Sequence, residues 1–153
     1  MSDLNFNDDM INLTPIIYYI DYIHLLQDDF YKRNYPNITP RDVTYLMNIF
    51  YYPNSSQKDL SDLLFVSESN VTQIIKRLDK NNFILRTADE SNKSRKIINL
   101  TEKGKIIVFK LLKDMYEWEC EFFSDYSPEE VEKFKKMLYE YAQKTVNSNK
   151  MFI

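Results

Sequence analysis

The order of local patterns between Ser56 and Leu100 constrains the fold of this chain more than any other feature. A short helical pattern, QKDLSDLL, is followed by a three-residue connection ending in Ser67 and then by a longer helical pattern, ESNVTQIIKRLDK. The longer pattern runs into two strand-forming runs, FILRT and KIINL, which flank the polar loop ADESNKSR. This order predicts a helix-turn-helix followed by a β-hairpin wing.

The rest of the chain has the pattern of a mainly helical protein. It contains one Gly and five Pro, with no low-complexity run and no internal repeat. Hydroxyl residues that can cap a helix directly precede a proline at Thr14, Thr39 and Ser127. Glu130 completes a capping box with Ser127, and Ser56 with Asp59 predicts a weaker one. Helices are expected at 14–34, 40–52, 56–64, 67–80, 101–124 and 127–147.

The expected fold class is therefore mainly α (α+β), a winged helix-turn-helix with long N- and C-terminal dimerisation helices. With 153 residues and 44% apolar content, the chain is expected to form one compact unit. We expect an N-terminal dimerisation helix over 1–38, the winged helix-turn-helix over 39–100 and C-terminal dimerisation helices over 101–153.

Composition excludes several classes of function. One Cys and one His are too few for a disulfide framework or a structural zinc site, so no metal is expected. The chain has no Gly-rich phosphate loop and no recognisable nucleophile or carboxylate pair, so we expect neither an enzyme nor a cofactor. Its apolar runs are far shorter than the roughly 20 residues that span a bilayer, and its N-terminus is acidic. A cytoplasmic protein without membrane contacts is expected.

Charge is distributed unevenly along the chain. The formal net charge is −3, but residues 67–110 hold ten basic and five acidic side chains, a net charge of +5, and the remainder carries −8. A basic middle between acidic ends is typical of a DNA-reading module set between dimerising helices. Ordinary scatter of charge on a solvated surface gives the same distribution, so charge alone does not decide between the two.

The longer helix of the predicted helix-turn-helix has two different faces. Its apolar positions repeat at helical spacing and are expected to pack on the core: Val71, Ile74, Ile75 and Leu78. The opposite face is polar: Ser69, Asn70, Gln73, Lys76, Arg77 and Lys80. Asn and Gln can pair with adenine edges, whereas Arg and Lys reach guanine or phosphate. Any amphipathic surface helix also has a polar face, so the wing and the charge distribution are what favour DNA binding.

Three segments match a known pattern over residues 39–104: ITPRDVTYLMNIF, QKDLSDLLFVSESNVTQIIKRLDKNNFILR and KIINLTEKG. Through them the sequence resembles the MarR family of bacterial and archaeal transcriptional regulators. In that family a wing strand ends in Leu-Thr-x-x-Gly before the first dimerisation helix, here Leu100, Thr101 and Gly104. The resemblance implies a triangular homodimer that binds double-stranded DNA at the two half-sites of a pseudo-palindromic operator, and we expect it to act as a repressor.

Two positions depart from the family pattern. The family usually has Gly after the recognition helix, where this chain has Asn82, the next best residue for a left-handed helix end. The family's wing commonly carries Asp-x-Arg, with the Arg in the minor groove, and Ser94 occupies the place of that Arg. Lys93 and Arg95 flank it, and we expect both on phosphate or in the groove. The candidate DNA contacts are Ser67, Ser69, Asn70, Thr72, Gln73, Lys76, Arg77, Asn92, Lys93, Ser94 and Arg95.

Apolar stripes on the terminal helices predict self-association. The first helix contributes Ile16, Ile17, Ile20, Ile23 and Leu26, and the last contributes Val131, Phe134, Met137, Leu138 and Tyr141. A chain of this size has too little other surface to cover both stripes, so a two-fold homodimer is expected.

The effector is the least constrained part of the prediction. Family members often release DNA when a phenolic or other amphipathic ligand binds between the dimer helices and the winged domain. A small aromatic or amphipathic effector is expected here, with Tyr18, Tyr22, Trp118 and Phe122 as candidate ligand contacts, although aromatic side chains on helices are usually core. Cys120 lies late in the chain and is expected to be a buried, inert thiol.

A winged helix used for protein contacts is the alternative interpretation. In that case the polar face of the longer helix meets an acidic partner and the basic segment is incidental. Specific DNA binding can be distinguished from this protein-contact role, because it predicts a steep loss of affinity with salt and a preference for one operator over random duplex.

Overall fold

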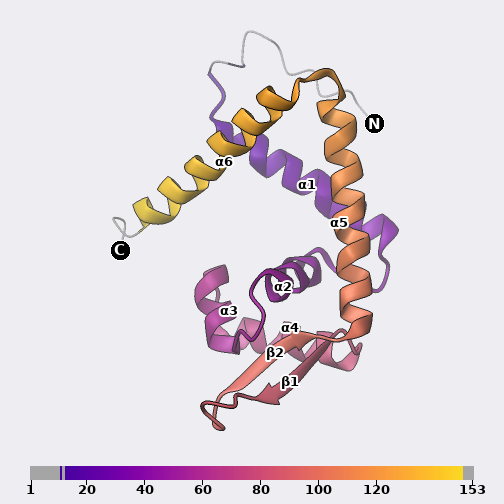
Figure 1. Ribbon diagram of the computed structural model, residues 1–153, viewed down its shortest axis with the longest axis vertical. Coiled ribbons are helices and arrows are strands. Elements are labelled where there is room, and N and C mark those ends of the chain that lie inside the picture. The colour runs from indigo at the N-terminus through magenta and orange to yellow at the C-terminus, as the bar shows by residue number, and fades with distance from the viewer. Residues whose placement is uncertain (1–10, 12, 150–153) are drawn as a thin grey trace. The chain divides into compact units, whose positions relative to one another are not determined.

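The computed structural model describes residues 11 and 13–149, and this part of the chain is mainly helical (Figure 1). Its elements in chain order are α1 (Ile16–Asn34), α2 (Pro40–Tyr51), α3 (Gln57–Leu64), α4 (Glu68–Lys80), β1 (Ile84–Ala88), β2 (Lys96–Leu100), α5 (Glu102–Phe122) and α6 (Pro128–Asn149). The six expected helices and the hairpin are confirmed, with ends within two residues of those predicted. The winged helix-turn-helix is α3, α4 and the β1–β2 hairpin.

The chain forms two compact units, whereas its length predicted one. The boundary lies inside α5, between Val108 and Phe109. The second unit has contacts of its own, because the Phe123 and Phe134 rings lie 5.6 Å apart and Lys135 Nζ lies 2.9 Å from Glu119 of α5. The winged helix-turn-helix belongs entirely to the first unit.

The apolar face of α4 is buried, as predicted. Val71, Ile74, Ile75 and Leu78 are each at most 5% exposed. Helix α4 contacts α2, α3 and β1, and burial of an aliphatic side chain of this size contributes roughly 1.5–3 kcal/mol. Packing of one face therefore fixes α4 in the domain and leaves its polar face to solvent.

Hydroxyl caps define most of the helix starts. Reciprocal capping boxes are present at Thr39–Asp42, Ser56–Asp59 and Ser127–Glu130. The Ser56 box, expected to be weak, is complete. The expected cap at Thr14 is wrong: α1 begins at Ile16, and Pro15 is its N-cap residue without a side-chain bond. Pro15 has φ −59° and ψ 141°, which is extended and not helical backbone.

Helix α4 ends at a left-handed residue, as predicted. Asn82 has φ 58° and donates its backbone N–H to Asp79 O at 2.9 Å, while Phe83 N–H donates to Leu78 O at 3.0 Å. These two bonds form a Schellman motif, in which a left-handed residue usually is Gly and sometimes Asn.

The Leu-Thr-x-x-Gly pattern has a direct structural reason. Thr101 donates its backbone N–H to Phe83 O at 3.0 Å, and its hydroxyl accepts from Gly104 N at 3.0 Å to cap α5. A Cβ on residue 104 would lie 2.0 Å from Phe83 O, closer than any side chain permits. Gly104 therefore allows α5 to begin against the end of α4.

The wing sheet has one more partner than the sequence predicted. Strands β1 and β2 are antiparallel, with Ile84 opposite Leu100 and Ala88 opposite Lys96. On the other side of β2, Ile98 forms an isolated bridge with Ser55 and donates its N–H to Ser55 O at 2.9 Å. A one-residue bridge has no periodicity, so no sequence pattern predicts it.

Candidate nucleic-acid interface

The polar face of α4 is open to solvent along most of its length. Ser67, Ser69, Asn70, Gln73 and Lys76 are all exposed. Ser67 Oγ accepts from Asn70 N at 3.4 Å and lies 2.9 Å from Ser69 Oγ, so both hydroxyls serve the helix start. Asn70, Gln73 and Lys76 follow at three-residue spacing, which places them on one side of the helix.

Thr72 contributes less than its place in the sequence suggests. It is half-buried, and its hydroxyl donates to Glu68 O at 2.8 Å within the same helix. A hydroxyl that bonds back to the preceding turn leaves little capacity for an external acceptor.

Arg77 points to the protein and not to the open face. Its guanidinium donates to both carboxylate oxygens of Asp42, with Nη2 at 2.5 Å and Nε at 2.9 Å from Oδ1, and to the Thr39 hydroxyl at 3.2 Å. The Asp42 side chain is 3% exposed and that of Arg77 is 41% exposed. Because both Asp42 and Thr39 belong to the capping box of α2, this pair holds the recognition helix against the start of α2.

The wing loop is shaped by short polar turns. The Asn92 side chain accepts from Ser94 N at 3.2 Å and from Ser94 Oγ at 2.6 Å, and Arg95 N–H donates to Asn92 O at 2.8 Å. Asn92 and Ser94 therefore shape the loop. Lys93 between them is exposed and forms no ion pair with the residues that the structure describes.

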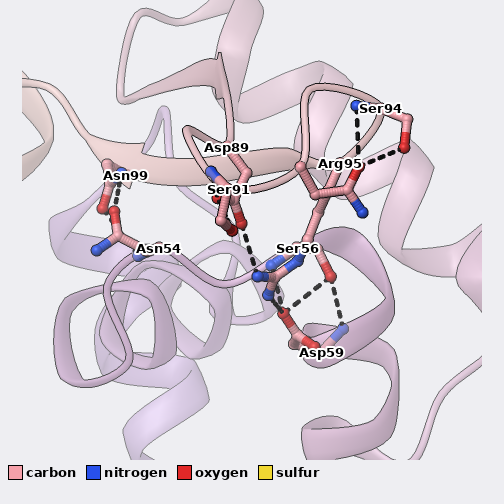
Figure 2. A network of polar contacts seen from close by, with 9 residues as sticks. Asn54, Ser56, Asp59, Asp89, Ser91, Ser94, Arg95 and Asn99 are labelled. Atoms are coloured by element: carbon pink, nitrogen blue, oxygen red, sulfur yellow. Dashed lines mark hydrogen bonds and ion pairs between the residues drawn. The ribbon is translucent and has the colours of Figure 1, made fainter.

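Arg95 lies between two carboxylates (Figure 2). Its Nη2 is 2.5 Å from Asp59 Oδ2 on α3, and its Nη1 is 2.9 Å from Asp89 Oδ2 in the wing loop. Hydrogen bonds from the Ser56 backbone and hydroxyl, and then from Arg95, lower the pKa of Asp59. The Ser91 hydroxyl and backbone, and then Arg95, lower the pKa of Asp89. Both acids are thus charged at neutral pH, and the two ion pairs raise the pKa of Arg95.

Sequence reasoning missed the residues that join the wing to the start of α3. Asn54, in left-handed backbone at φ 64°, donates its backbone N–H to Asn99 Oδ1 at 3.0 Å, and Asn99 Nδ2 donates to Asn54 Oδ1 at 2.9 Å (Figure 2). Two adjacent asparagine amides thereby tie the α2–α3 turn to β2. The one available signal is Asn54 after Pro53, which is typical of a turn.

Two of the four expected ligand contacts lie in the first unit and two lie in the second. Tyr18 and Tyr22 lie one helical turn apart on α1 in the first unit, whereas Trp118 and Phe122 lie on α5 in the second. Phe122 stacks on Tyr126 with ring centroids 5.8 Å apart. In the first unit a groove of about 280 Å³ lies beside the turn of the helix-turn-helix, lined by His24, Asp28, Pro40, Arg41, Thr44, Tyr45, Leu64 and Val66.

Cys120 is also placed differently from expectation. It is exposed on α5, where a buried thiol was expected. The second unit consists of the distal part of α5 with α6, and two helices alone bury few of their side chains. Among the described residues, no group of three or more His, Cys, Asp or Glu side chains is placed to hold a metal ion. The described helices include none with the length and apolar character needed to cross a membrane.

The fold defines the class of this protein as a winged helix-turn-helix protein. The sequence model of the MarR family matches residues 38–96. The chain is 32% identical over 104 residues to the HTH-type transcriptional regulator YybA of Bacillus subtilis, covering 67% of this chain and 69% of YybA. It is 27% identical over 129 residues to an HTH-type transcriptional regulator of Bacillus cereus, covering 84% and 82%.

Solved structures agree with these sequence matches. The crystal structure of MarR has a TM-score of 0.76 and 27% identity, covering 89% of this chain and 94% of that one. Streptococcus pneumoniae FabT, solved in complex with DNA, shares the fold with a TM-score of 0.69 at 20% identity, covering 86% and 92%. This chain belongs to the MarR family, whose members are DNA-binding transcriptional regulators and not enzymes. The predicted resemblance is confirmed.

Proposed function

We propose that this protein is a cytoplasmic repressor that binds a pseudo-palindromic operator as a homodimer through α4 and the wing. The observation that carries the proposal is the exposed row of Asn70, Gln73 and Lys76 on a helix whose opposite face is buried. Amides can read adenine edges in the major groove, and the lysine reaches guanine or phosphate. FabT, which shares the fold, was solved on DNA, and this supports the proposed partner.

The assignment of DNA contacts within the candidate set follows from the internal bonds. We assign base reading to Asn70 and Gln73, and phosphate contact to Lys76 and Lys93, because none of these four side chains is held by a hydrogen bond or ion pair among the described residues. Ser67, Ser69, Thr72, Asn92 and Ser94 shape the helix and the loop through internal hydrogen bonds and are assigned no more than secondary polar contacts. Arg77 and Arg95 act through the elements that they hold.

The proposal of a homodimer rests on exposed apolar side chains, taken separately in each unit. On α1, Ile16, Ile17 and Ile23 are 60%, 48% and 51% exposed. On α6, Phe134 and Met137 are 50% and 60% exposed. Large apolar side chains exposed in rows usually mark an interaction surface. We propose 1–38 and 101–153 as dimerisation segments and 39–100 as the DNA-binding domain.

Regulation by a ligand extends the proposal. A small aromatic or amphipathic effector would release DNA by binding the DNA-competent and incompetent arrangements unequally, with a coupling of about 1–3 kcal/mol for an ordinary switch. Tyr18, Tyr22, Trp118 and Phe122 remain the candidate contacts for it.

Selection of bound duplex from a random pool tests the central proposal. We expect one enriched palindromic sequence, an affinity that falls steeply with salt, and a dimeric mass by light scattering. Lys76→Gln should reduce the salt slope by about two, one for each protomer of the dimer. Lys133→Gln on α6 removes the same charge outside the winged domain and should leave the slope unchanged. Enrichment of no sequence, with binding to an acidic protein instead, would favour the interaction module.

A further inference from the structure

Arg95 connects two elements that are far apart in the sequence. Asp59 is the third residue of α3, the first helix of the helix-turn-helix, and Asp89 begins the wing loop. The guanidinium lies between their carboxylates, at 2.5 Å and 2.9 Å (Figure 2). We call Arg95, Asp59 and Asp89 the wing latch.

Each carboxylate of the wing latch is held independently of Arg95. Asp59 accepts from Ser56 N at 2.7 Å and from Ser56 Oγ at 2.9 Å, the bonds of the α3 capping box. Asp89 accepts from Ser91 N at 2.9 Å and from Ser91 Oγ at 2.7 Å. Arg95 therefore joins two acceptors with fixed positions, one on the helix and one in the wing.

The backbone of the loop closes around the same residue. Asp89 N–H donates to Arg95 O at 2.9 Å, and Arg95 N–H donates to Asn92 O at 2.8 Å. The loop is thus shaped by its own turns, and the Arg95 side chain is what attaches it to α3.

We propose that Arg95 is a positioning residue that fixes the wing on the helix-turn-helix, and that Lys93 makes the direct phosphate contact of the wing. This inference rests on the proposed DNA binding. For Arg95 to reach a phosphate, it would leave Asp59 and Asp89 as two uncompensated negative charges beside the duplex. Lys93 lies in the turn between Asn92 and Arg95, is exposed, and has no ion pair to break among the described residues.

Two pairs of charge-matched variants separate positioning from direct contact. Asp59→Asn and Asp89→Asn each break one side of the wing latch, and Asp89→Asn does so without altering the α3 cap. Asp62→Asn on α3 and Glu90→Gln in the loop remove the same charge from exposed side chains without touching Arg95. Affinity is measured for all four, and for Arg95→Gln, on a duplex selected from a random pool by the unaltered protein.

A positioning role and a contact role predict opposite signs. If Arg95 positions the wing, Asp59→Asn and Asp89→Asn each weaken binding by roughly five-fold, as expected for loss of a small exposed ion-pair network. The double variant Arg95→Gln/Asp59→Asn then binds DNA no more weakly than the single variant Arg95→Gln. Asp62→Asn and Glu90→Gln leave binding unchanged or slightly tighter. If Asp59→Asn and Asp89→Asn instead bind DNA as tightly as the control variants or more tightly, the two carboxylates do not position the wing through Arg95 and the proposal fails.

Amide hydrogen exchange provides a readout that needs no DNA. The Asp89 and Arg95 amides should exchange several-fold faster in Asp59→Asn and Arg95→Gln than in Asp62→Asn, while core amides of α2 stay unchanged. Equal protection of these two amides in all variants would overturn the positioning role of Arg95, even if the protein binds DNA. Absence of DNA binding by the unaltered protein, with the exchange difference present, would overturn the proposed function alone.

Discussion

Replacement of Arg77 by Ala should lower the stability of the winged domain. Loss of one partner from a fully buried ion pair typically costs 3–5 kcal/mol. Here Asp42 is 3% exposed but Arg77 is 41% exposed, so water can partly replace the lost guanidinium. Thr39 also continues to donate its N–H and hydroxyl to Asp42, both at 2.8 Å. We therefore expect a loss of about 2 kcal/mol, below the range for a fully buried pair.

Urea denaturation of the unaltered protein and of Arg77→Ala measures this loss directly. Lys76→Ala is the matched control, because it removes a neighbouring charge from the exposed face and should change stability by less than about 0.5 kcal/mol. Adding Asp42→Asn to Arg77→Ala should recover part of the loss, since a neutral amide is less costly to leave unpaired than a charged carboxylate.

Salt dependence of DNA binding then distinguishes the two roles of Arg77. A positioning role predicts weaker binding with an unchanged slope of log affinity against log salt. A phosphate contact predicts a slope reduced by about two, one for each protomer of the dimer, as expected for Lys76→Gln. Unaltered stability together with a reduced slope in Arg77→Ala would refute the positioning argument.

Three further predictions concern the framework of the domain. Gly104→Ala should destabilise by roughly 1–3 kcal/mol in urea, because its Cβ would lie 2.0 Å from Phe83 O; equal midpoints would show that α5 can shift away. Phe65 is 73% exposed with φ 54°, so Phe65→Gly should stabilise by about 0.5–1 kcal/mol through relief of left-handed strain, and a lower midpoint would mean that the ring makes needed contacts. Since the folded pKa values of Asp59 and Asp89 are lowered, the wing latch should be intact above about pH 4, the ordinary carboxyl pKa, and weaken as pH falls through the folded values. The test is amide hydrogen exchange in the wing, corrected for the intrinsic exchange rates. A change in protection between neutral pH and pH ~5 would contradict this assignment.

The elements of the fold could be predicted because their signals are local. Capping hydroxyls act on backbone groups three residues away, and the apolar face of α4 repeats at helical spacing, so each pattern is complete within a few residues. Asn82 belongs to the same class, since a left-handed helix end depends on the conformational preference of one residue. The exposed positions Asn70, Gln73 and Lys76 follow from that face by geometry alone.

Only the tertiary structure shows which carboxylates the two arginines of the candidate site meet within the protein. Arg77 and Arg95 were both expected on DNA, yet their partners Asp42 and Asp59 lie 35 and 36 residues earlier in the chain. The Ser55 bridge and the division inside α5 were likewise absent from any local pattern. Sequence spacing determines which side of a helix a side chain occupies. It does not determine which distant carboxylate that side chain meets, because this depends on how separate elements pack.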